Sequence, residues 1–82
     1  MQVKPIRSDL RKYIKSRNLS KKFSKQLEKF KENPRHPSLH TEILVPKHLK
    51  IYSFRIDRKY RAIFILPNSN LAEIVDINDH YK

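Results

Sequence analysis

The spacing of apolar residues changes near residue 41, and this change limits the folds that the chain can adopt. In the first half, apolar residues recur every three or four positions, as on one face of an α-helix. They are Leu10, Tyr13, Ile14, Phe23, Leu27 and Phe30. In the second half, Tyr52, Phe54 and Ile56 alternate with polar residues, as in a half-buried strand. We therefore expect an α+β fold in which helices precede a sheet.

The helices have recognisable ends. A first helix is expected over residues 9 to about 17, because Ser8 offers an N-cap. A second helix should end near residue 33, since Pro34 prevents its continuation. The link between the two helices is short, so they should form an antiparallel hairpin that packs on the sheet. Residues 3–6 are expected to form a short edge strand, because proline disfavours a central one.

Four further strands are expected in the second half. They span residues 41–45, 51–57, 60–66 and 71–77. The predicted fold is thus an N-terminal helical hairpin packed on a twisted, mainly antiparallel sheet of four to five strands. The chain contains no glycine, so turn positions with positive φ should fall to Asn or Asp.

Strand register decides where two arginines point. With a three-residue loop at 58–60, Phe54 lies opposite Phe64 and every second residue faces the core. The predicted core face holds Tyr52, Phe54, Ile56, Ala62, Phe64 and Leu66. The same register places Arg55 and Arg61 together on the other face. A two-residue loop would separate them, and we favour the first register because it segregates the aromatic residues.

Two adjacent arginines repel each other, so their pairing needs an explanation. Either an anion binds between Arg55 and Arg61, or each is neutralised by Asp57, Asp76 or Glu73.

Net charge indicates the class of partner. The 82 residues include 19 Lys and Arg against 8 Asp and Glu, a formal net charge of +11. This excess favours a polyanion: nucleic acid or a strongly acidic protein. There is no cysteine, which excludes a disulfide framework and fits a reducing cytoplasm. No apolar run resembles a signal peptide or a membrane span, so we expect a cytoplasmic protein with no membrane partner.

The histidines do not indicate a metal site. His36 and His40 are separated by Pro37, so they cannot share a helix face as zinc-binding histidines do, and we expect no metal or cofactor. His80 follows the last predicted strand, where it either frays or folds back over the sheet. In the second case an imidazole would join the arginine pair, and Glu42 offers a carboxylate. A base, an acid and fixed cations are the groups that cleave RNA through its own 2′-hydroxyl.

Three segments carry a family resemblance. Residues 36–40 (HPSLH), 52–56 (YSFRI) and 60–64 (YRAIF), followed by His80-Tyr81, resemble the RelE/ParE toxin superfamily, and within it the YoeB-type and RelE-type mRNA interferases. The resemblance covers essentially the whole chain and implies a single RelE-like toxin domain over residues 1–82.

The resemblance also implies an activity. Such toxins of type II toxin–antitoxin systems are ribosome-dependent endoribonucleases that cleave mRNA in the decoding site without a metal. By this resemblance Arg61 would stabilise the transition state and Arg55 would bind phosphate. His80 would be the acid and Tyr81 would orient the RNA. Glu42 would be either the base or a salt-bridge partner.

The expected partners follow from the same resemblance. They are a cognate antitoxin protein, mRNA and the ribosome. The residues expected to bind RNA are Arg55, Lys47, Lys50, Arg58 and Lys59. Two alternatives stay open: a ParE-like inhibitor of DNA gyrase, which lacks the terminal His-Tyr pair, and a basic RNA-binding module without catalysis.

Overall fold

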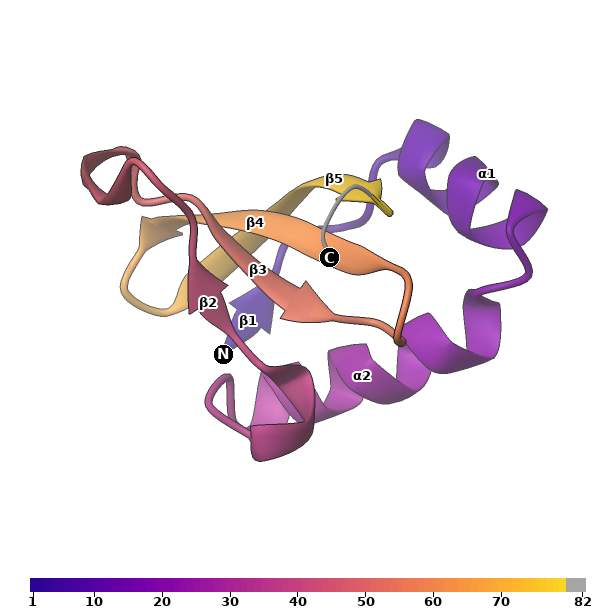
Figure 1. Ribbon diagram of the computed structural model, residues 1–82, viewed down its shortest axis with the longest axis horizontal. Helices are drawn as coiled ribbons and strands as arrows, with labels where there is room; N and C mark the ends of the chain where they lie inside the picture. Colours follow the sequence, from indigo (N-terminus) through magenta and orange to yellow (C-terminus); the bar gives the residue numbers. More distant parts are fainter. Residues whose placement is uncertain (80–82) are drawn as a thin grey trace.

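The computed structural model describes residues 1–79 and has two helices on one face of a five-stranded sheet (Figure 1). The elements are β1 (Gln2–Val3), α1 (Ser8–Ser16), α2 (Ser20–Glu32), the 3-10 helix η1 (Pro37–Leu39), β2 (Glu42–Ile43), the 3-10 helix η2 (Lys47–Leu49), β3 (Tyr52–Arg55), β4 (Arg61–Asn68) and β5 (Leu71–Asn78). The strand order is β1-β5-β4-β3-β2, in which β1 is parallel to β5 and the other pairs are antiparallel. The predicted α+β fold and the N-terminal edge strand are confirmed, although this strand begins and ends earlier than expected.

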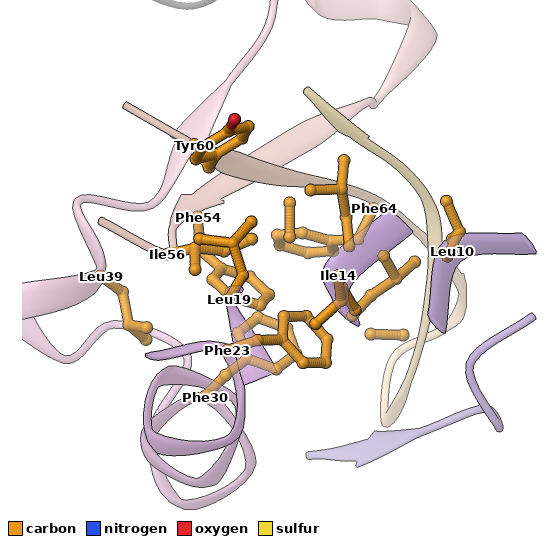
Figure 2. Packing of buried hydrophobic residues seen from close by; sticks show 14 residues of the cluster. Leu10, Ile14, Leu19, Phe23, Phe30, Leu39, Phe54, Ile56, Tyr60 and Phe64 are labelled. Atoms are coloured by element: carbon orange, nitrogen blue, oxygen red, sulfur yellow. The ribbon is translucent and has the colours of Figure 1, made fainter. Parts of the chain in front are cut away.

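The core lies between the helices and the sheet (Figure 2). Phe30 of α2 is fully buried, and its ring stacks on that of Phe54 with centroids 4.9 Å apart. The same ring meets Phe64 edge-on, also at 4.9 Å. Leu10 and Ile14 of α1 extend this cluster toward β5. Burial of these side chains, each contributing about 1.5–3 kcal/mol, holds the helical hairpin on the sheet.

The register of the central hairpin differs from the predicted one by two residues. Phe54 lies opposite Ala62, and not opposite Phe64. The loop has the expected three residues but occupies 57–59, one position earlier than predicted. The reason is Asp57, whose Oδ1 accepts the backbone N–H of Lys59 and that of Tyr60, each at 2.8 Å. A shift of two residues returns each side chain to its predicted face, so the face assignment is correct.

Leu66 departs from the predicted core face. It is 37% exposed, because β4 and β5 lose their regular pairing between Ile65 and Asn68. An irregular pairing of this kind interrupts the regular alternation of side chains between the two faces.

Positive φ angles occur at Asn18, His40 and Lys50. Asn18 fits the prediction, while His40 and Lys50 contradict it. Each of these two follows a short 3-10 helix, where a left-handed residue reverses the chain. The expected N-cap is also wrong, since Ser8 is the first residue of α1 and Arg7 precedes it without a capping side chain. No helix within residues 1–79 is long and apolar enough to cross a membrane.

Asp57 is the carboxylate that defines the β3–β4 turn. Burial alone would raise its pKa, but hydrogen bonds from the Tyr60 and Lys59 N–H groups and from Lys22 outweigh that effect. The pKa of Asp57 therefore lies below its ordinary value. A lowered pKa means that the charged form stabilises the fold above the ordinary pKa, and that this contribution is lost as the pH falls.

We expect Asp57→Ala to lower the free energy of unfolding at neutral pH by about 1–3 kcal/mol, because two backbone donors lose their acceptor. The difference from wild type should begin to shrink as the pH falls through about 4, the ordinary pKa of Asp, and should vanish only below the lower pKa of the folded state. Urea unfolding at several pH values measures both effects. The control is Asp9→Ala, whose carboxylate is exposed and forms a salt bridge with Arg7. Equal losses in the two variants, or a loss that persists in acid, would contradict the role of Asp57.

Candidate active site

The sheet face opposite the core carries the candidate site. Arg55 of β3 and Arg61 of β4 lie directly opposite each other, and Asn78 of β5 continues the row. The next row contains Glu42, Ser53, Ile63 and Asp76. Side chains of directly paired residues point to the same face, so Glu42 and both arginines share one surface. The structure thus confirms that the two arginines share the outer face, although the predicted register did not place them directly opposite each other.

Arg61 is held in place by a set of oxygen acceptors. The residue is only 6% exposed, and its Nε donates to Ser53 Oγ at 2.9 Å. Its Nη2 donates to the His40 carbonyl oxygen and, more weakly at 3.4 Å, to the Ser53 carbonyl oxygen. Ser53 itself is fully buried. A guanidinium with several fixed acceptors keeps one orientation, which is a condition for preorganised stabilisation of a phosphate.

The His40 carbonyl is in turn positioned by α2. Gln26 is buried, and its Nε2 donates to the Ser38 carbonyl at 3.2 Å and to the Arg55 carbonyl at 2.8 Å. One amide group therefore ties η1 to β3. At the end of η1, His40 has φ of 45° and leads the chain into β2. The helix below the sheet thus fixes the loop whose last carbonyl receives Arg61.

Arg55 has a different environment. It is half-buried, and no residue of 1–79 forms a salt bridge with it. The carboxylates that were considered as neutralising partners are engaged elsewhere. Asp57 binds Lys22 at 3.1 Å, Glu73 lies 3.6 Å from Lys4, and Asp76 accepts the Asn78 side chain and the Ile77 N–H. Of the two explanations for the arginine pair, internal neutralisation of Arg55 by these groups is excluded.

Glu42 lies at the edge of the same face. It is exposed, and it sits beside Ser53, the serine that binds Arg61. An open cavity of about 830 Å³ adjoins the same edge, and Glu42 and His40 are among the residues that line it. Tyr52 and Phe64 of the core face line it as well, whereas Arg55 and Arg61 do not, so this cavity lies on the helix side of the edge and is separate from the arginine face.

The other residues expected to bind RNA do not form one cluster. Lys47 and Lys50 are exposed in the connection between β2 and β3, which projects beyond the sheet at the upper left of Figure 1. Arg58 and Lys59 are exposed in the turn after β3, at the opposite end of that strand. These cations therefore flank the arginine pair from two ends.

His80 and Tyr81 lie outside the described residues, so their predicted roles stay predictions. Within residues 1–79, no group of three His, Asp or Glu side chains is placed to hold a metal ion. His36, which was considered beside His40, has its Nδ1 at 3.1 Å from the Ser38 N–H, which donates to it.

Sequence reasoning missed two groups that hold Arg61. Ser53 was placed on the arginine face, but a small polar residue there gave no further indication of its role. The His40 contribution is a backbone carbonyl, which every residue possesses, so no side-chain pattern points to it. Gln26 had a weak signal, because an amide on the apolar stripe of α2 requires a buried hydrogen-bond partner.

Comparisons with known proteins bear on the fold. No protein-family model and no curated protein matches the sequence. Among solved structures, the chain resembles a YoeB/ParE toxin from Agrobacterium tumefaciens with a TM-score of 0.73 and 17% identity, over 99% of this chain and 100% of that one. It also resembles a chain of the YoeB-YefM complex from Staphylococcus aureus, with a TM-score of 0.69 and 22% identity, over 98% of this chain and 94% of that one. A YoeB dimer from the same organism gives a TM-score of 0.65 and 22% identity over the same shares. The chain therefore has the fold of the YoeB/ParE toxins, as its sequence resemblance implied.

Proposed function

We propose that this protein is the toxin of a type II toxin–antitoxin system and that it cleaves mRNA on the ribosome, in the cytoplasm. The observation that supports this most is the pair of directly opposed arginines, of which Arg61 is immobilised by Ser53 and His40. A phosphate that passes through a pentacoordinate state gains charge on its oxygens, and fixed guanidinium groups are suited to stabilise it. The shared fold with YoeB toxins agrees with this assignment.

The proposed reaction is attack of an RNA 2′-hydroxyl on the adjacent phosphate. A base removes the 2′ proton, the 2′ oxygen bonds to phosphorus, and the 5′ oxygen leaves with a proton from an acid. Glu42 is the proposed base, because its carboxylate lies on the same face as the arginine pair. His80 is the proposed acid and Tyr81 orients the RNA. Arg55 is more exposed than Arg61 and binds the incoming phosphate.

A cognate antitoxin is part of the proposal. One structure with this fold is a complex of YoeB with YefM, and a net charge of +11 suits an acidic segment of such a partner. The ParE-like alternative keeps the fold and the antitoxin but acts on DNA gyrase, and the name of one similar structure includes both types. The experiment below separates the two.

Induction of the wild-type protein in bacteria should produce new mRNA 5′ ends in register with codons, mapped by primer extension. Arg55→Ala and Arg61→Ala should each reduce these ends by about 10²–10³-fold, the usual cost of one lost charge-stabilising donor. The charge-matched control is Lys4→Ala, whose ammonium lies beside Glu73. Growth arrest with intact mRNA and impaired supercoiling would establish the gyrase alternative, and no effect at all would leave a non-catalytic RNA-binding module.

Ser53→Ala tests the positioning of Arg61. Loss of the Oγ acceptor leaves a buried guanidinium N–H unsatisfied, which should cost about 1–3 kcal/mol of stability. Cleavage should fall at least about tenfold even where the variant is folded, because the guanidinium is no longer fixed. Ser8→Ala, at the exposed first position of α1, is the control. Wild-type cleavage by folded Ser53→Ala would show that Ser53 does not position the arginine.

Glu42→Gln separates a base from a salt-bridge partner. If Glu42 is the base, its replacement by an amide should lower the single-turnover rate by about 10²–10⁴-fold and abolish the increase of this rate with pH. Glu73→Gln is the matched control, since Glu73 pairs with Lys4 away from the arginines. A pH profile of unchanged shape with a modest rate loss would assign Glu42 a structural role instead.

A further inference from the structure

The connection between α2 and β2 contains a polar network that the proposed reaction does not use. It lies within residues 36–40, of which only the last carbonyl was assigned a role, as an acceptor for Arg61. The side chains of His36 and Ser38 are both half-buried, and they contact each other. A satisfied polar network in a partly buried place usually fixes a local conformation. The conformation in question here is that of the short helix η1.

His36 is the N-cap of η1. Its Nδ1 accepts the Ser38 N–H at 3.1 Å and lies 2.9 Å from Ser38 Oγ. Lys29 of α2 donates to the same Oγ at 3.3 Å, so the hydroxyl proton of Ser38 is free to point toward Nδ1. A backbone N–H can only donate, and Nδ1 must therefore be an acceptor. This role requires a neutral imidazole that carries its proton on Nε2.

η1 links this cap to Arg61. The helix has only three residues, and its C-cap His40 turns the chain with φ of 45°. The His40 N–H donates to the Pro37 carbonyl at 3.2 Å, while the His40 carbonyl accepts from Arg61 Nη2. The bond from Gln26 to the Ser38 carbonyl acts on the same residue that the cap holds. A helix of one turn has few hydrogen bonds of its own, so loss of the cap should displace its last carbonyl.

Protonation of His36 removes the cap. Histidine is the side chain that gains a charge as the pH falls from about 8 to about 5. A proton on Nδ1 would face the Ser38 N–H, which is itself a donor. It would also bring a second cation to the hydroxyl that already accepts from Lys29. The acceptor that holds the start of η1 is therefore present at neutral pH and lost in mild acid.

Charged and titratable groups from several elements face His36. η1 packs against α2 and β3, and His36 is one of the residues that line the open cavity at the sheet edge. These groups are Lys29 of α2, Tyr52 of β3, Glu42 of β2, the amine of Met1, and Arg35 and His40 of the connection. Histidine and α-amino groups are the ones that titrate near neutral pH. Variants are therefore needed that separate His36 from the other groups of this set.

We propose that neutral His36 is a positioning residue for Arg61, and that protonation of His36 releases the guanidinium from its fixed orientation. The arginine pair then works at neutral pH and is impaired in mild acid, because a mobile guanidinium stabilises a phosphate less well. The consequence for RNA cleavage rests on the proposed function. The consequence for the side chain of Arg61 does not.

The test uses a variant that keeps the cap but loses the titration. Asn is a preferred N-cap residue, and its Oδ1, like Nδ1 of histidine, is attached to Cγ, so His36→Asn should hold η1 at every pH. His36→Ala removes the acceptor at every pH. His48→Asn is the matched control, because His48 is an exposed histidine of η2. The NMR order parameter of Arg61 Nε–H is measured between about pH 7.5 and pH 5.5, where histidine titrates.

In the wild type, this order parameter should fall from about 0.85 at the higher pH to below about 0.6 at the lower pH. His36→Asn should keep the high value throughout, and His36→Ala should have the low value throughout. His48→Asn should follow the wild type. Arg7 Nε, which donates to Asp9, is the reference within each spectrum and should not change.

Three results would overturn the proposal. The first is a constant order parameter of Arg61 in the wild type. The second is a fall that persists in His36→Asn, and its disappearance in His40→Asn would then assign the titration to that histidine. The third is an equal fall at Arg7 Nε, which would show a general loosening of the fold.

Cleavage separates this proposal from the proposed function. At about pH 5.5, the folded wild type should cleave mRNA about tenfold more slowly than His36→Asn, while the two rates should agree at about pH 7.5. Order parameters that behave as expected without any cleavage of mRNA would support the positioning role and refute the endoribonuclease proposal. Cleavage of mRNA with a constant order parameter and equal rates in the two proteins would refute the positioning role alone.

Discussion

A buried guanidinium determines much of this small structure. Arg61 sits on a central strand with 6% exposure, and an uncompensated charge at that depth would cost several kcal/mol. Its compensation comes from Ser53 on the neighbouring strand and from the His40 carbonyl at the entrance to β2. That carbonyl stays in place because Gln26 ties η1 to β3. The short strand β2, the loop before it and the second helix are thus linked to one charged side chain.

The alternation of apolar residues was sufficient to predict the faces of the central hairpin, but not its register. A period of two determines the face on which each side chain lies, but registers that differ by an even number of residues give the same faces. The predicted pairing of β3 with β4 was wrong by two residues. What selects the register is local turn chemistry: the Asp57 carboxylate accepts two backbone N–H groups and begins the turn one residue earlier. Both arginines still lie on the predicted face, because a shift of two residues leaves every side chain on the same face.

The arrangement of the arginine face could be predicted where it depends on side chains, but not where it depends on the backbone. The common face of Arg55 and Arg61 was predicted from alternating positions, whereas the roles of these arginines and of Glu42 come from family resemblance and stay predictions. The acceptor at His40 is a carbonyl, and its place depends on a left-handed residue that the sequence did not indicate. In a chain without glycine, such conformations fall to other residues, here His40 and Lys50 as well as Asn18. Burial of Arg61 was also unforeseen, since two arginines on an outer face suggest equal exposure.

The charged side chains on the two sides of the sheet differ in how they are held. On the outer face, the guanidinium of Arg61 is fixed by oxygen acceptors of Ser53 and His40. On the helical side, many cations are exposed, and the electrostatic interaction of each one is weak. Orientation serves a reaction, because stabilisation of a transition state requires fixed groups. A large number of cations favours affinity for a nucleic acid, because the release of counterions scales with the number of phosphates contacted. A domain of 82 residues has one layer of helices and one of strands, so each layer has an outer surface of its own to which one of these roles can be assigned.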